Sequence, residues 1–201
     1  MSKKKQKQKE WKKQKNRQIY IVVSQTGTIL SRILKALTHA KYNHASIAFD
    51  DELENMYSFG RLNPYNPVVG GLVRESTHFG TFKRFADTEA VVLEIDVDER
   101  TYSRLILDVN EMYDQKKKYH YNYLGLFAAF FGVQVRQKRC FYCSEFVKYL
   151  LKKHKIVKKN SLCGITKPMD FLSLSNAQVK LSRLESNSCV ALTFSTAALS
   201  L

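Results

Sequence analysis

A cysteine near the start of a predicted helix has the position of a catalytic nucleophile. Cys143 stands just before 146–151, where apolar residues repeat at the spacing of an amphipathic helix. Its thiol is therefore expected in or next to the first turn, where backbone N–H groups have no partner within the helix. The helix dipole favours a thiolate there, and the same N–H groups can hold the oxyanion of a tetrahedral intermediate. Cys143 is thus the candidate nucleophile.

Cysteine hydrolysis also needs an imidazole that takes the thiol proton and a group that orients this imidazole. His44 opens the run 44–49, which reads as a strand with His44, Ser46 and Ala48 on one face. The small residues beside His44 leave room for another element to approach. We therefore expect His44 to be the base.

Each of the two residues also has an ordinary structural interpretation. Free cysteine is among the most buried residue types, so Cys143 can equally be an inert core thiol. A histidine that begins a strand is often no more than a satisfied surface or core residue. Spacing alone therefore does not decide whether His44 and Cys143 are catalytic residues.

Cys140 and Cys143 form a CxxC pair that has two further interpretations. A zinc ribbon would need a second close pair, whereas Cys163 and Cys189 lie far apart in the sequence. A thioredoxin-like dithiol would place Cys140 before the helix, with two bulky aromatic residues between the cysteines. We expect neither a metal nor a cofactor, and no disulfide framework.

Hydrophobic periodicity predicts the elements that position these residues. Runs rich in β-branched and aromatic residues predict strands at 19–23, 44–49, 56–59, 72–75 and 91–97. Amphipathic or apolar runs predict helices at 28–39, 102–113, 121–131 and 143–151, with Thr28 and Asp98 as caps of the first two. The stretch 121–131 is too short to span a bilayer, so we expect a buried helix there. Residues 168–172 are expected to pack against the main domain.

Three segments together resemble a known family. Asn43–Ala48 reads Asn-His-x-Ser-Ile-Ala, 57–60 reads Tyr-Ser-Phe-Gly, and 141–147 reads Phe-Tyr-Cys-Ser-Glu-Phe-Val. This combination is similar to the circularly permuted NlpC/P60 group of papain-like cysteine peptidases and amidases, often called YiiX/YebB-like. In that group the histidine strand precedes the cysteine helix, as it does here, and the similarity runs from about 19 to 172.

The resemblance implies an α+β, permuted papain-like fold in which the cysteine helix packs on a central antiparallel sheet carrying the histidine. It implies Cys143 as nucleophile and His44 as base. The orienting group falls on the following strand, where the matching residue is Ser58. A serine hydroxyl can accept the imidazole N–H but adds no negative charge. Glu75 is the nearest downstream acidic alternative, and Gln25 could donate to an oxyanion.

Length and charge indicate how the chain is organised. Its 201 residues, 44% of them apolar, predict one domain over 18–175, a basic disordered tail over 1–17 and a C-terminal extension over 176–201 whose place the sequence does not indicate. The formal net charge is +15, and the tail carries much of it. No run is long enough for a transmembrane segment, and no apolar signal-peptide core follows the basic start. We therefore expect a soluble, cytoplasmic protein.

These features predict a cysteine hydrolase that cleaves an amide bond in a small peptide or amino-acid conjugate through an acyl-thioester intermediate. A thiol acyltransferase or lipid-ester hydrolase of the same fold is the first alternative, with the stretch 119–131 lining an acyl pocket or simply forming core. A non-catalytic module is the second. It would bind nucleic acid or an anionic membrane through residues 1–17, otherwise a solvated tail, and Arg136–Arg139. The sequence does not indicate the oligomeric state.

Overall fold

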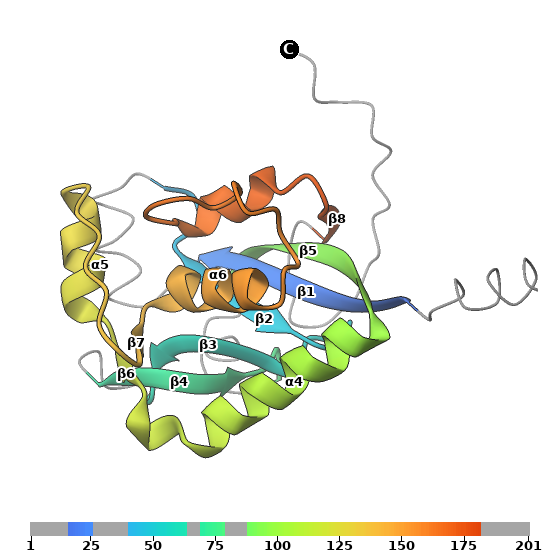
Figure 1. Ribbon diagram of the computed structural model, residues 1–201, viewed down its shortest axis with the longest axis horizontal. Helices are drawn as coiled ribbons and strands as arrows, with labels where there is room; N and C mark the ends of the chain where they lie inside the picture. Colours follow the sequence, from blue (N-terminus) through green and yellow to red (C-terminus); the bar gives the residue numbers. More distant parts are fainter. Residues whose placement is uncertain (1–15, 26–39, 64–68, 79–87, 182–201) are drawn as a thin grey trace, which may run out of the picture.

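A six-stranded antiparallel sheet forms the centre of the computed structural model, which describes residues 16–25, 40–63, 69–78 and 88–181 (Figure 1). The strands are β1 (Asn16–Gln25), β2 (His44–Ala48), β3 (Met56–Arg61), β4 (Gly70–Glu75), β5 (Glu89–Asp98) and β8 (Gln178–Leu181). Their order across the sheet is β4-β3-β2-β1-β5-β8. The predicted α+β class with a central antiparallel sheet is confirmed.

The central strand β1 is apolar because both of its faces are covered. Ile19, Ile21 and Val23 belong to the large core beneath the helices. Tyr20 and Val22 belong to a smaller cluster with residues of β2, β3 and β5. β1 pairs with β2 on one side and with β5 on the other. Its apolar run therefore follows from burial on both sides.

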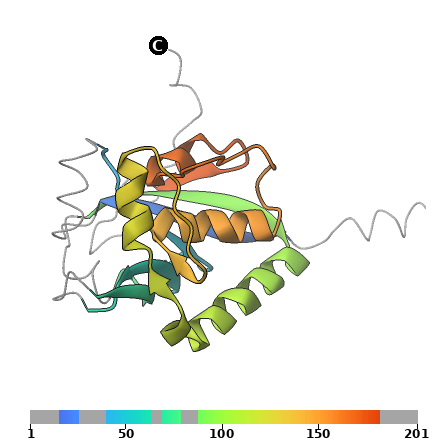
Figure 2. The same cartoon turned by 60° about the vertical axis from the view of Figure 1, so that its left-hand side comes forward.

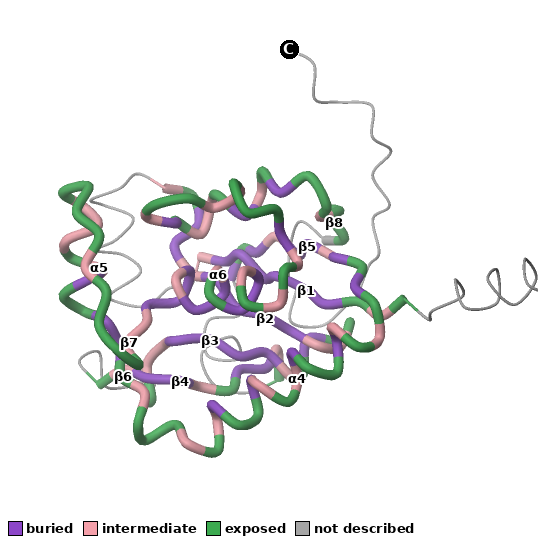
Figure 3. The backbone as a smooth tube through the Cα atoms, in the orientation of Figure 1, coloured by how far each residue is buried: buried purple, intermediate pink, exposed green. Residues whose placement is uncertain are grey.

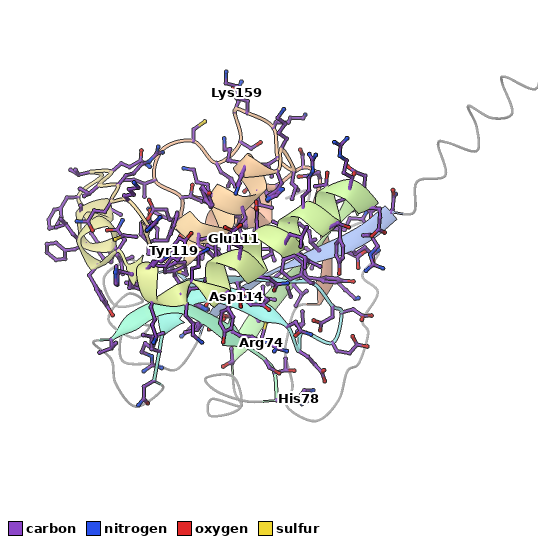
Figure 4. The ribbon with its side chains drawn as sticks, turned by 60° about the horizontal axis from the view of Figure 1, so that its bottom comes forward. Arg74, His78, Glu111, Asp114, Tyr119 and Lys159 are labelled. Carbon is purple, nitrogen blue, oxygen red and sulfur yellow. The ribbon has the colours of Figure 1, made fainter. Side chains whose placement is uncertain are left out.

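Helix α4 (Glu99–Asp114) lies along the sheet and contributes to the large core (Figure 4). Asp98 caps it, as predicted, because its Oδ1 accepts a hydrogen bond of 2.9 Å from the Thr101 N–H. Its buried residues recur at the spacing of one helical face and are Tyr102, Leu105, Val109 and Met112. In Figure 4, Glu111 and Asp114 mark the last turns of this helix.

Helix α6 (Cys143–Lys153) packs on β2 and β3, in the middle of the structure (Figure 1). Its buried face consists of Phe146, Val147, Leu150 and Leu151, as the periodicity predicted. The ring of Phe146 lies 5.2 Å from that of Phe59 on β3. This packing brings the first turn of α6 to the end of the sheet where β2 begins.

Helix α5 (Tyr123–Phe130) corrects one prediction, because it is not buried. It protrudes from the edge of the molecule, and its tube is largely green and pink in Figure 3. Only Gly125 of its residues is buried, whereas Phe127 is 62% exposed and Phe131, which follows the helix, is 71% exposed. The apolar composition did not reveal that only one side of this short helix is covered. A parallel pair, β6 (His120–Tyr121) and β7 (Cys140–Phe141), holds the two ends of the α5 segment together.

Two short 3-10 helices complete the described fold, η1 (Lys116–Lys118) and η2 (Pro168–Ser173). η2 docks against β1 and buries Phe171, as predicted for this segment. β1 begins at Asn16, inside the predicted tail, and β8 lies inside the predicted C-terminal extension. The predicted helix 28–39 and residues 1–15 and 182–201 lie outside the described residues. Within the described ranges, no helix is long and apolar enough to cross a membrane.

Candidate active site

Cys143 is the first residue of α6 and lies against the start of β2. Its side chain is buried, and its Sγ donates to the carbonyl oxygen of Asn43 at 3.9 Å. Tyr142, the N-cap residue, makes no side-chain capping hydrogen bond. The first N–H groups of an α-helix have no acceptor within the helix, so they are available near this sulfur. The geometry thus offers a thiol beside donors that can stabilise an oxyanion.

Neighbouring polar contacts determine where α6 begins. Glu145, at the third helical position, accepts a hydrogen bond of 3.2 Å from Asn122 Nδ2. This bond fixes the first turn of the helix to Asn122. Ser144 Oγ donates to the carbonyl of Thr166 at 2.7 Å. These contacts keep the first turn of α6 in position.

His44 lies between an acidic side chain and Cys143. Its Nε2 is 3.2 Å and 3.3 Å from the two carboxylate oxygens of Glu75, at the end of β4. Cys143 lies close enough to the His44 ring to help raise the pKa of the imidazole. Because Nε2 faces Glu75, the ring has Nδ1 left for the sulfur. The fold therefore brings Cys143, His44 and Glu75 into one chain of contacts.

The pair of His44 and Glu75 is charged at neutral pH. Burial lowers the pKa of His44, but the charge of Glu75, the nearby Cys143 side chain and the hydrogen bond that the ring donates to Glu75 outweigh it and raise this pKa to about 10. Burial raises the pKa of Glu75, but the His44 charge, hydrogen bonds from His44 and Ser46, and the nearby Ser58 hydroxyl outweigh it and lower this pKa. An imidazolium and a carboxylate therefore face each other inside the protein.

Ser46 belongs to this constellation, although its sequence position indicated no role beyond small size. Its Oγ donates to Glu75 Oε2 at 2.6 Å and lies 3.2 Å from His44 Nε2. Ser46 is two residues after His44 on β2, so both side chains share one face of the strand. The alternation of side chains along the strand was the signal that placed Ser46 beside His44. It could not show that the Glu75 carboxylate, from another strand, lies next to both residues.

Ser58 does not occupy the orienting position that the family resemblance assigned to it. The contact with His44 is made by Glu75, and among the described residues no group meets hydrogen-bond geometry with the buried Ser58 Oγ. Ser58 instead lies close enough to the Glu75 carboxylate to help lower its pKa. Gln25 ends β1, one residue after Ser24, which pairs with His44.

A pocket of about 310 Å³ opens beside Cys143. One wall comes from the site itself and the loop after it, including Asn43, Tyr142 and Ile165. The apolar part of its lining comes in part from α5, through Leu126, Ala129 and Phe130. The pocket can therefore hold a substrate group with an apolar part next to the sulfur.

The other described cysteines do not line the pocket beside Cys143. Cys140 is half-buried on β7 and Cys163 is exposed, and both are free thiols, as is Cys143. Cys189 lies outside the described residues. Within the described ranges, no group of three His, Cys, Asp or Glu side chains is arranged to hold a metal ion.

Fold and site together define the protein as an α+β protein with a Cys-His-Glu constellation at the end of an antiparallel sheet. No model of a known protein family, no curated protein and no solved structure matches the chain. Its function is therefore inferred from the geometry of its site and the resemblance of its motifs.

Proposed function

We propose that this protein is a cysteine hydrolase of the permuted papain-like, NlpC/P60 (YiiX/YebB-like) type. Its reaction is the cleavage of an amide bond in a small peptide or amino-acid conjugate through an acyl-thioester intermediate. The observation that carries this proposal is the position of His44, which contacts both Cys143 at the start of α6 and the buried carboxylate of Glu75.

Nucleophilic attack begins from an ion pair. At neutral pH His44 carries a proton, since its pKa is raised to about 10. The imidazolium charge stabilises a thiolate at Cys143, and the thiolate attacks the substrate carbonyl carbon. The free N–H groups at the start of α6 then stabilise the oxyanion.

Two proton transfers by His44 complete the cycle. His44 gives its proton to the leaving amine as the tetrahedral intermediate collapses to the thioester. The neutral imidazole then takes a proton from water, which attacks the thioester and releases the acid. Glu75 stabilises the imidazolium in both halves of the reaction and holds the ring with Nδ1 towards the sulfur.

The apolar wall of the pocket favours one alternative reaction of the same site. Leu126, Ala129 and Phe130 line the same pocket as Cys143, so an apolar acyl group would fit there. The alternative is acyl transfer or lipid-ester hydrolysis through the same thioester. The difference lies in the leaving group and the acceptor, whereas the roles of Cys143, His44 and Glu75 stay the same.

Alkylation with iodoacetamide at about pH 6 tests the nucleophile. We expect Cys143 to react first although it is buried, and His44→Ala to slow its labelling by about tenfold or more. Cys163 is the control for accessibility, because it is exposed. The proposal would be contradicted if the cysteines were labelled in order of exposure, with Cys163 first, and if His44→Ala had no effect.

Mass spectrometry of the intact protein after incubation with cell extract identifies the acyl group. A mass added to the protein of unchanged sequence but not to Cys143→Ser would identify the thioester. The size of the added mass would distinguish a peptide from a fatty acyl group. Circular dichroism of both variants checks that loss of labelling does not reflect unfolding.

A further inference from the structure

Helix α5 has two apolar faces, only one of which belongs to the active-site pocket. Leu126, Ala129 and Phe130 line that pocket. The outer face of α5, formed by Leu124, Phe127 and Phe131, points the other way, because these residues are spaced by three and four positions. Their exposed fractions are 56%, 62% and 71%. Large apolar side chains gathered on one protruding helix mark an interaction surface.

The segments on both sides of α5 are basic. Residues 115–144 contain six Lys or Arg residues and no Asp or Glu. All six are exposed: Lys116, Lys117 and Lys118 before the helix, and Arg136, Lys138 and Arg139 after it. Figures 1 and 2 show the segment between α5 and β7 returning beside the helix.

A second, wider pocket adds cations next to this segment. It measures about 630 Å³, and its lining includes Arg136, Lys148 and Lys152 together with one acid, Glu145. Burial lowers the pKa of Lys148, as do the charges of Arg136 and Lys152, which indicates that these cations crowd one another. Crowded cations favour an anionic partner.

We propose that the outer face of α5 and the basic segments that flank it dock the protein on an anionic membrane surface. Apolar and aromatic side chains can enter the boundary between head groups and acyl chains, while the lysines and arginines bind the lipid phosphates. α5 would lie on the membrane without crossing it. The Cys143 pocket then opens beside the helix that contacts the lipid.

Charge and surface chemistry favour a membrane over other partners. In a twofold dimer through this face, the same cations would meet each other without any acid from 115–144 to neutralise them. Nucleic acid would match the cations, and its bases could stack on Phe127 and Phe131, but the exposed Leu124 would have no partner. An anionic bilayer accounts for both the charge and the apolar face.

Vesicle flotation with the full chain tests this surface. We would use Cys143→Ala, so that binding is measured without chemistry, and vesicles of phosphatidylglycerol mixed with phosphatidylcholine. The salt concentration should be about 0.15 M, and every variant keeps the basic residues 1–17, so that the attraction of these residues is the same in each comparison. We expect binding to fall by about tenfold or more when Phe127→Glu and Phe131→Glu are combined.

Leu107→Glu is the matched control, because Leu107 is 67% exposed but lies on α4. Its binding should stay within about twofold of the parent. Equal binding by the double variant and the parent, or no binding by either, would overturn the docking surface. A parent that sediments as a dimer, and a double variant that sediments as a monomer, would assign the face to a second copy and also overturn it.

Fluorescence gives a second measurement that does not depend on the glutamate variants. Trp11 is the only tryptophan, so Trp11→Phe with Phe127→Trp places a single probe on α5. We expect a blue shift with vesicles and quenching by brominated lipid. An unchanged spectrum would contradict insertion. Because all these measurements use Cys143→Ala, they succeed or fail independently of the proposed cysteine chemistry.

Discussion

At the scale of single residues, the partner of His44 decides what kind of site this is. Glu75 brings a full negative charge to within 3.2 Å of His44 Nε2, and Ser46 binds the same carboxylate at 2.6 Å. A serine in that position could orient the ring but could not stabilise the imidazolium by charge. The observed arrangement is therefore better suited to an ion-pair mechanism than the Ser58 arrangement that the motif suggested.

Replacing Glu75 tests this difference. Glu75→Gln keeps the side-chain volume but removes the charge that raises the pKa of His44. We expect the alkylation rate of Cys143 at about pH 6 to fall by about tenfold or more, and the pH at which His44 loses its proton to fall below about 10. Nuclear magnetic resonance of the imidazole and timed alkylation measure the two effects.

Ser58→Ala is the matched control on the neighbouring strand. Its hydroxyl has no hydrogen-bond partner among the described residues, so its removal should change the alkylation rate by less than about threefold. A large effect of Ser58→Ala together with a small effect of Glu75→Gln would return the orienting role to Ser58.

At the scale of elements, Asn122 connects the apolar helix to the cysteine helix. Its Oδ1 accepts from the Gly125 N–H at 2.8 Å, which caps α5. Its Nδ2 donates to the Val135 carbonyl at 3.1 Å and to Glu145 Oε2 at 3.2 Å. Because Glu145 lies in the first turn of α6, one buried amide sets the position of α5 relative to Cys143.

Gly125→Ala should disrupt this connection. A Cβ at Gly125 would lie 2.2 Å from Asn122 Nδ2, so the amide would have to move and give up hydrogen bonds. We expect a loss of about 1–3 kcal/mol in the free energy of unfolding, measured with urea. Gly71→Ala is the control, because its Cβ would lie 3.4 Å from the nearest atom of Leu62. Similar losses in both variants would show that Asn122 has no special role.

At the scale of the whole molecule, the ion pair of His44 and Glu75 stabilises the fold in a pH-dependent way. The pKa of His44 rises from 6.5 to about 10 on folding, so its contribution is complete below 6.5 and is lost as the pH rises towards 10. The pKa of Glu75 falls below 4.5 on folding, so its contribution is present above 4.5 and is lost as the pH falls through the folded value. The ion pair therefore stabilises the folded state most between about pH 4.5 and pH 6.5, the ordinary pKa values of the two groups.

Urea unfolding at several pH values tests this linkage. At about pH 6 we expect Glu75→Gln to lower the free energy of unfolding by about 2–4 kcal/mol. The difference from the parent should shrink as the pH rises from about 6.5 to about 10, because the parent loses the His44 contribution. A difference that stays constant over this range would contradict the ion pair.

The sequence by itself determined the local elements that carry the site. Periodicity placed α6 with Cys143 at its first turn, because the apolar residues of a helix on a sheet must recur on one side. It also placed His44 and Ser46 on one face of a strand and Asp98 at the start of α4. Helix periodicity, strand alternation and helix capping depend on residues that are neighbours in the sequence. The sequence alone is therefore enough to predict them.

Only the tertiary structure decided which distant groups meet and which apolar surface stays exposed. Glu75 reaches His44 through strand pairing from β2 to β3 to β4, and pairing register depends on contacts between strands that local patterns do not specify. The exposure of α5 depends on whether another element covers Leu124, Phe127 and Phe131. A covered helix and an uncovered one can have the same apolar sequence, so the sequence pattern does not distinguish them. Long-range packing thus gave the site its carboxylate and left the helix beside it exposed.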